Sequence, residues 1–221
     1  MKTLAKFSGL LCTTVAICSM ASAASAGNLV KNGGFENPNL DQGTWRWYNE
    51  QTNDDVEGWD PLNSASTIEI RHDVAGTAYE GNQFAEIDSH RYSAQQGESM
   101  GFFQDIMTQV DKKYKLSFAF GPREQSRVDG DNLFKVTFGD MWELDAGNST
   151  DGWKLFSETI TATSDTTRLQ FELMGKYDTL GANIDAVHVT AVPEPLSLLG
   201  LAAIGTIGAA GAVRKRQAVT S

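Results

Sequence analysis

Residues 114–120 read YKLSFAF, and the apolar residues of this stretch fall at every second position. Successive side chains of a β-strand point to opposite faces of a sheet, so this alternation predicts a strand with one buried face. Leu116, Phe118 and Phe120 would share the buried face, and Ser117 and Ala119 would lie on the other. The small side chains on that second face leave room above the sheet, as a shallow groove would require.

The same alternation recurs along the chain. It is found at residues 67–71, 134–138 and 169–174, and residues 184–190 read as a final strand. Clusters of turn-forming residues separate these segments at 129–132, 138–140 and 146–148. No amphipathic helical pattern of about twelve residues stands out. Short strands with one buried face predict an all-β fold, in which two antiparallel sheets pack as a β-sandwich or jelly roll.

The segment between Gly27 and Ala191 has the size of one domain. It carries 13 Lys and Arg residues against 27 Asp and Glu residues, and it contains no cysteine. Such an acidic domain is unsuited to nucleic acid, which proteins bind with clustered basic charge. It is compatible with divalent cations and with neutral ligands such as sugars. Without cysteine the domain has no disulfide and no thiolate metal site, so its stability must come from its core.

The N-terminus, residues 1–26, reads as a secretory signal peptide. Lys2 and Lys6 precede a largely apolar run, and Ala24-Ser25-Ala26 supplies the small residues that signal peptidase requires. We expect cleavage before Gly27, with a cut three residues earlier as the alternative. Both cysteines of the chain lie inside this segment.

The C-terminus has three parts in a fixed order. Pro193-Glu194-Pro195 comes first, an uncharged run follows from Leu196 to Val213, and Arg214-Lys215-Arg216 comes after it. As a helix the run would be about 27 Å long, close to the thickness of the hydrocarbon core of a bilayer. The sequence therefore predicts a C-terminal transmembrane helix. The basic cluster and residues 217–221 would remain in the cytoplasm, and the domain would lie outside.

In order and position, residues 192–216 resemble the PEP-CTERM sorting signal of Gram-negative bacteria that make extracellular polysaccharide. The resemblance implies an exported protein that is transiently anchored in the inner membrane. There, an exosortase-type enzyme would recognise and cut the tail. The product would belong to the cell surface or the extracellular matrix. The alternative is an ordinary C-terminal anchor helix, which also implies export.

A second resemblance spans nearly the whole domain. Residues 28–36, NLVKNGGFE, look like the opening strand of galactose-binding-like jelly-roll domains, which include several carbohydrate-binding modules and the DUF642 cell-wall proteins. Further stretches fit the same pattern in order, at 58–59, 68–70, 80–88, 103–105, 114–118 and 181–187. The resemblance implies a jelly-roll fold more than it implies a function, because such folds host many functions. DUF642 proteins of plants usually have two tandem domains with cysteines, whereas this chain has one domain without them.

The resemblance also implies a structural calcium site. In galactose-binding-like modules an acidic residue of the opening motif often joins one of the closing strand around Ca²⁺. The matching residues here are Glu36 and Asp185. Calcium prefers oxygen ligands, which carboxylates and backbone carbonyls supply. The alternative is that Glu36 caps a turn and that Asp185 merely begins a strand.

Aromatic and arginine side chains are the candidates for ligand binding. Trp45 and Trp47 lie in a polar stretch and share strand parity, and tryptophan rings stack on the C–H faces of sugars. Arg71 and Arg123 could hydrogen-bond sugar hydroxyls from a groove on the polar face of the sheet. The alternatives are tryptophans that fill the core, which is the expectation for Trp59, and a solvated face with ordinary salt bridges.

A catalytic role is not expected. His72, His90 and His188 lack metal-ligand spacing, and the sequence has no Gly-x-Ser-x-Gly elbow. We therefore expect a non-catalytic module that binds carbohydrate, with the producer's own exopolysaccharide as partner. Its site could lie on a sheet face or at loop tips. Two alternatives remain, a structural or adhesive matrix protein without sugar specificity and, less favoured, a polysaccharide-active enzyme.

Overall fold

The structure is a computed structural model that describes residues 27–49, 55–87, 98–124, 130–148 and 150–193. Within these ranges it has eleven strands and no helix, and the strands form two antiparallel sheets. The predicted all-β fold is therefore confirmed. In the same ranges no helix is long and apolar enough to cross a membrane. The predicted signal peptide and the tail from Glu194 onward, with Pro195 and the membrane helix, lie outside the described residues.

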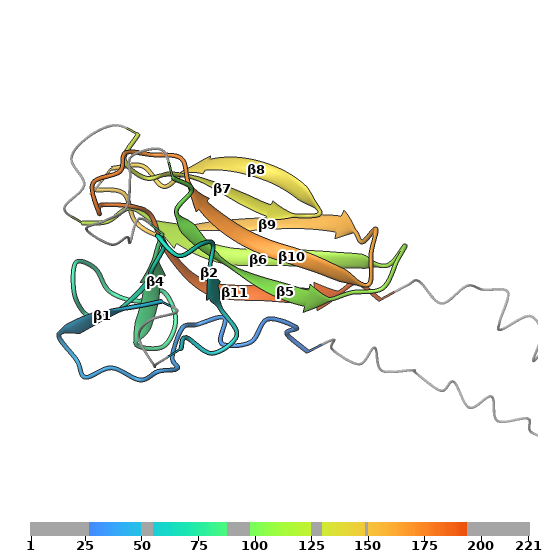
Figure 1. The fold of residues 1–221 in the computed structure, drawn as a ribbon, viewed down its shortest axis with the longest axis horizontal. Helices are drawn as coiled ribbons and strands as arrows, with labels where there is room; N and C mark the ends of the chain where they lie inside the picture. The colour runs from blue at the N-terminus through green and yellow to red at the C-terminus, as the bar shows by residue number, and fades with distance from the viewer. Residues whose placement is uncertain (1–26, 50–54, 88–97, 125–129, 149, 194–221) are drawn as a thin grey trace, which may run out of the picture.

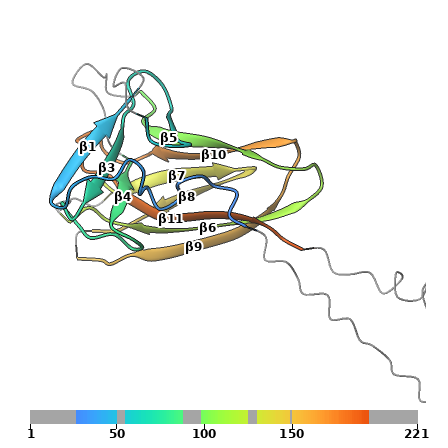
Figure 2. The ribbon, with the colours of Figure 1, turned by 90° about the horizontal axis from the view of Figure 1, so that it is seen from below.

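The first sheet has six strands in the order β1-β3-β4-β11-β6-β9. They are β1 (Thr44–Tyr48), β3 (Ile68–His72), β4 (Gln83–Glu86), β11 (Asn183–Ala191), β6 (Lys113–Gly121) and β9 (Lys154–Thr161). The second sheet has five strands in the order β2-β5-β10-β7-β8. They are β2 (Asp60–Pro61), β5 (Gly101–Met107), β10 (Thr166–Leu173), β7 (Leu133–Phe138) and β8 (Asp140–Asp145). Figures 1 and 2 show the sheets stacked as a β-sandwich, with both ends of the described chain leaving it away from β1.

The core lies between the sheets and follows the predicted alternation. Leu116, Phe118 and Phe120 of β6 are all buried in it. The ring of Phe118 joins the two sheets, because its centroid lies 4.8 Å from that of Phe156 on β9 and 5.1 Å from that of Phe171 on β10. Aromatic pairs at these separations contribute beyond the area that they bury. The alternation in β6 thus identifies the residues that hold the sandwich together.

Trp59 belongs to this core, as expected. It is 3% exposed, and its ring stacks on Phe35 at a centroid distance of 5.2 Å and meets Phe102 edge-on at 5.4 Å. Its Nε1 donates a hydrogen bond of 3.1 Å to the carbonyl oxygen of Asn32. A buried indole N–H needs such a partner. Trp59 therefore fixes the opening segment of the domain against the core.

The opening segment runs beside the last strand. The amide of Leu29 donates to the carbonyl oxygen of Val189, and the amide of Val187 donates to that of Gly33, both at 2.8 Å. A Cβ atom at Gly33 would lie 2.1 Å from the carbonyl oxygen of Val187, so only glycine fits there. The beginning of the domain therefore lies against its last strand, β11.

Candidate functional site

One face of the six-stranded sheet points away from the core, and we call it the outer face. Across five of its strands the register aligns one row of residues, namely Trp47, Glu69, Glu86, Asn183 and Gly121. The neighbours of Glu69 on β3, Ile68 and Ile70, point the other way and belong to the core. The four residues predicted to contact a ligand all lie on or beside this face.

Trp45 and Trp47 lie on the outer face at its edge strand, β1. Their exposed fractions are 52% and 41%, whereas the next residue, Tyr48, is buried in the core. Because the two tryptophans are two positions apart on a strand, they leave the sheet on the same side. They form an exposed aromatic platform, which we call the β1 tryptophan pair. A flat ligand with an apolar face could stack on it.

Beside this pair lies a buried ion cluster formed by Glu69, Arg71, Glu86 and Arg123. Arg71 Nη2 bridges Glu69 Oε1 and Glu86 Oε2, and Arg123 Nη1 lies 3.1 Å from Glu86 Oε1. The amide of Gly181 donates a hydrogen bond of 2.9 Å to Glu86 Oε1. The cluster therefore ties β3 and β4 to the segments that follow β6 and precede β11.

Burial controls the charge state of the cluster. The loss of water around the carboxyl group of Glu86 raises its pKa to about 8; Arg71 opposes this shift and the neighbouring charge of Glu69 adds to it. Arg123 and the amide of Gly181 also favour the ionised form. Burial therefore works against the negative charge that the two arginines favour on Glu86.

Arg71 and Arg123 lie at the predicted face, but little of either side chain reaches solvent. Their exposed fractions are 3% and 14%, and Arg123 Nη1 also donates to the carbonyl oxygen of Thr179. Among the residues that the structure describes, Nε and Nη1 of Arg71 and Nε of Arg123 meet no hydrogen-bond acceptor. Both arginines hold the outer face together, and a direct contact with a ligand stays a prediction.

A second aromatic group lies on the outer face near β6 and β9. The ring centroid of Trp153 is 6.1 Å from that of Tyr79 and 5.9 Å from that of Phe84. Tyr79 is 46% exposed, and Phe84 is buried beneath the group. Trp153 and Tyr79 lie 74 positions apart in turn-rich segments. No local sequence pattern joins them, so the sequence alone does not bring Trp153 and Tyr79 together.

Glu36 and Asp185, the predicted calcium ligands, are neighbours in space. They meet where β11 shifts register between Asp185 and His188, and Ala186 adopts a φ of 49°. Such a bulge re-aims the side chains beside it. A Cβ atom built at Gly34 would lie 3.8 Å from Glu36 Cγ and 3.9 Å from Asp185 Oδ1, so both acids approach the same short stretch of backbone.

Backbone amides hold both carboxylates in place. The N–H groups of residues 79–80 donate to Asp185 Oδ2 at 2.8 and 2.9 Å, and those of residues 82–83 donate to Glu36 Oε1 at 2.6 and 3.0 Å. Burial raises the pKa of Asp185 to about 7; the amides oppose this shift, and the charge of Glu36 adds to it. The two carboxylates therefore repel each other in a site that water reaches poorly.

A hard cation would relieve this repulsion, but it would have to share the carboxylates with backbone amides, since that of Ala186 also donates to Asp185 Oδ1 at 2.6 Å. Calcium would complete its shell with backbone carbonyl oxygens or water, since the described residues offer no group of three acidic, histidine or cysteine side chains there. Glu36 and Asp185 would hold the ion between the opening and closing segments of the domain. The calcium site stays a prediction.

Chelation tests this site. We expect EDTA to lower the melting temperature of the protein by several degrees, because an ion bound only to the folded state stabilises it. Differential scanning fluorimetry with excess calcium and with EDTA would measure the shift, and the variant Asp185→Asn should no longer respond. An unchanged melting curve on chelation would eliminate the calcium site.

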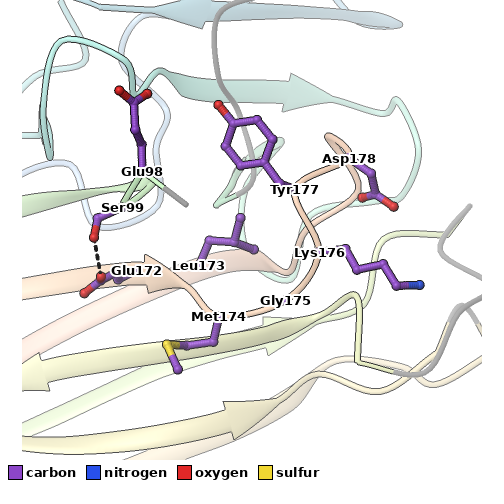
Figure 3. A pocket seen from close by; sticks show the side chains of 9 residues that line it. All are labelled: Glu98, Ser99, Glu172, Leu173, Met174, Gly175, Lys176, Tyr177 and Asp178. Carbon is purple, nitrogen blue, oxygen red and sulfur yellow. Dashed lines mark hydrogen bonds between the residues drawn. The ribbon is translucent and has the colours of Figure 1, made fainter. Parts of the chain in front are cut away.

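A pocket at the end of β10 represents the alternative, a site at loop tips. It measures about 570 Å³ and includes Glu98, Glu172 and Tyr177 in its lining. Figure 3 shows Glu172 joined to Ser99 on one side of this pocket, with Lys176 and Asp178 on the other. Glu172 also accepts a hydrogen bond from Gln170 and pairs with Lys135 at 2.6 Å. Its carboxylate is thus already satisfied, and the described residues that line the pocket include no tryptophan.

No family model matches this sequence, and no curated protein matches it. Among solved structures, a Stig cyclase (Fisc) from Fischerella sp. TAU is 19% identical, and the match covers 78% of this chain and 100% of that one with a TM-score of 0.57. This likeness shows the fold alone. The fold itself therefore leaves open whether such a domain binds or catalyses.

Two further solved structures resemble the chain less closely. An arabinofuranosidase bound to arabinose is 11% identical over 76% of this chain and 27% of that one, with a TM-score of 0.49. A family 16 carbohydrate-binding module is 14% identical over 74% of this chain and 99% of that one, with a TM-score of 0.45. Carbohydrate-binding modules recur among such structures, but scores below 0.5 do not bear on function.

Proposed function

We propose that this protein binds polysaccharide through the outer face of its six-stranded sheet and has no catalytic role. The β1 tryptophan pair carries the proposal. The two large rings lie on one side of a strand and are 52% and 41% exposed. Their apolar surface is in contact with water, and a bound sugar could cover it. The pair lies on a strand of the β-sandwich, which is a rigid element. Binding to it would therefore lose less conformational entropy than binding to a flexible loop.

The buried ion cluster supports this site from behind. Glu69 lies opposite Trp47, and Arg71 lies opposite Trp45, in the register of β1 and β3. Because Arg71 bridges Glu69 and Glu86, it fixes the strand next to the tryptophans. The arginines would act as positioning residues for the platform, because little of either side chain reaches solvent.

The charge of the domain suits a neutral glycan. Its acidic residues outnumber its basic ones by about two to one, so an anionic polysaccharide would meet repulsion over most of the surface. Calcium at Glu36 and Asp185 would be structural in this account, since it would join the two ends of the domain.

Export through the predicted signal peptide and sorting tail forms part of the proposal. The last strand ends at Ala191, and Val192 and Pro193 are exposed directly after it, so a tail that begins there would be open to a membrane enzyme. We propose that an exosortase-type enzyme processes the protein at the inner membrane of a Gram-negative bacterium. Its ligand would then be the producer's own exopolysaccharide, at the cell surface or in the matrix.

A glycan-array screen of the purified protein, with calcium and again with EDTA, tests the proposed function. We expect binding to a defined class of neutral glycans, and tryptophan fluorescence should change when these glycans are added. A blank array from folded protein would contradict carbohydrate binding. Self-association that depends on calcium and not on sugar would instead support a structural matrix role.

A further inference from the structure

A separate pocket opens on the outer face beside Trp153, away from the β1 tryptophan pair. It measures about 180 Å³. Its lining includes three glycines and four residues with functional side chains, namely Gly76, Gly121, Gly152, Glu124, Asp151, Trp153 and Asn183. We call it the Trp153 pocket. It is small beside the sites that hold drug-sized ligands, and its volume suits a single sugar ring.

The aromatic wall of the pocket is fixed in place. Trp153 Nε1 donates a hydrogen bond of 3.0 Å to the carbonyl oxygen of Thr77, and the ring is held edge-on by Tyr79 and Phe84. A Cβ atom at Gly121 would lie 3.3 Å from the ring, so this glycine lets the indole lie close against β6. The ring therefore offers a preorganised stacking surface.

The side chains that line the pocket are rich in hydrogen-bond acceptors. Asn183 is 2% exposed; its Nδ2 donates to the carbonyl oxygen of Pro122 at 3.2 Å, while its Oδ1 meets no donor among the described residues. Asp151 and Glu124 add carboxylates, which accept hydrogen bonds only.

Two cations lie near these acids, and both are already paired. Lys154 lies 3.8 Å from Asp151 Oδ2 and donates to the carbonyl oxygens of residues 145 and 146. Arg123, which lies between Pro122 and Glu124 in the sequence, pairs with Glu86.

A ligand of this pocket must therefore bring donors. Sugar hydroxyls donate hydrogen bonds, and the apolar face of the ring can stack on Trp153. A sugar acid would place its carboxylate against Asp151 and Glu124, which would repel it.

We propose that the Trp153 pocket binds one neutral sugar unit of the polysaccharide and rejects sugar acids. This inference rests on the proposed function, since it adds a second contact on the same face of the domain. The β1 tryptophan pair would stack on the polysaccharide at one edge of the outer face. The Trp153 pocket would bind a sugar unit farther along the same face and select it by its chemistry.

Ligand-observed NMR on the full chain in a mild detergent would test the pocket, with galactose and galacturonic acid as a pair that differs only at C6. We expect saturation transfer from the protein to galactose, and binding of galacturonic acid at least about tenfold weaker. Equal or tighter binding of galacturonic acid would overturn the proposal.

The variant Gly152→Leu should block the pocket without harming the fold. A Cβ atom at Gly152 has no neighbour within 4 Å, and the residue has no left-handed φ. We expect this variant to lose the galactose signal, whereas Thr161→Leu, at the exposed far end of β9, should keep it. Galactose binding to Gly152→Leu at wild-type strength would overturn the inference.

Comparing Gly152→Leu with a variant that lacks Trp45 and Trp47 separates a failure of the pocket from a failure of the proposed function. If Gly152→Leu changes nothing while loss of Trp45 and Trp47 abolishes polysaccharide binding, the pocket is wrong and the proposed function stands. If no neutral sugar or polysaccharide binds the wild-type chain, both are wrong.

Discussion

Replacing Arg71 with methionine is expected to lower the free energy of unfolding by about 3–5 kcal/mol near pH 9, the cost of removing one partner from a buried ion pair. Arg71 is 3% exposed and bridges Glu69 and Glu86, which lie opposite each other on β3 and β4. Without it, two like charges would face each other, and Arg123 would still pair with Glu86. Urea unfolding of both proteins would measure the loss.

The second sheet provides a matched control. Arg168 binds Asp105 with two parallel hydrogen bonds of 2.8 and 2.9 Å, but both side chains are nearly half exposed. Arg168→Met should therefore cost only about 1 kcal/mol. The account of the ion cluster would be wrong if the two substitutions had equal effects. The cost of Arg71→Met should also shrink near pH 6, where a proton neutralises Glu86.

Stability should fall as pH rises from about 4.5 to 8, and Glu86 should account for much of the fall. The pKa of its carboxyl group is raised from 4.5 to about 8 by burial, so the folded state holds a proton that the unfolded chain releases. This contribution is complete below the unfolded pKa and is lost as pH rises through the folded one. Asp185, with its pKa raised to about 7, acts in the same direction. The rise in the pKa of Glu86 from 4.5 to about 8 corresponds to several kcal/mol of unfolding free energy.

The variant Glu86→Gln isolates this effect. Glutamine keeps the size of the side chain without the titration, so we expect a flatter dependence of unfolding free energy on pH between 5 and 9, with stability close to wild type at pH 5. Chemical denaturation of both proteins at a series of pH values would measure how the unfolding free energy depends on pH. A wild-type slope in Glu86→Gln would mean that another group controls the pH dependence.

The strands that could be predicted are those that bury one full face. β6, β7 and β10 alternate because Leu116, Val136 and Leu169 and their partners fill the core. β9 gave no such pattern, since Ile160 is its one fully buried residue in the structure. At the edge of a sheet, side chains of almost any type are tolerated, so periodicity fades. The short strand β4 is buried on both sides and carries no alternation either.

The candidate site could be predicted only in part, for a similar reason. The parity of Trp45 and Trp47 is a local property and correctly placed both on one side of β1. The burial of Arg71 is not local, because it depends on Glu86 and Arg123, which come from distant segments. The Trp153 pocket likewise depends on β6 and the turn before β4. Such contacts are specified by tertiary packing, which no window of sequence contains.

The affinity of the protein for an array-positive polysaccharide, with and without Trp45 and Trp47, tests the central claim most directly. Tryptophans at the centre of an interface contribute roughly 2 kcal/mol each, so Trp45→Ala/Trp47→Ala should weaken binding by about a hundredfold or more. Met141→Ala, a matched change at a 60% exposed residue of the other sheet, should leave it unchanged. Isothermal titration of the three folded proteins would decide the matter. Equal affinity in all three would contradict a binding site on the outer face.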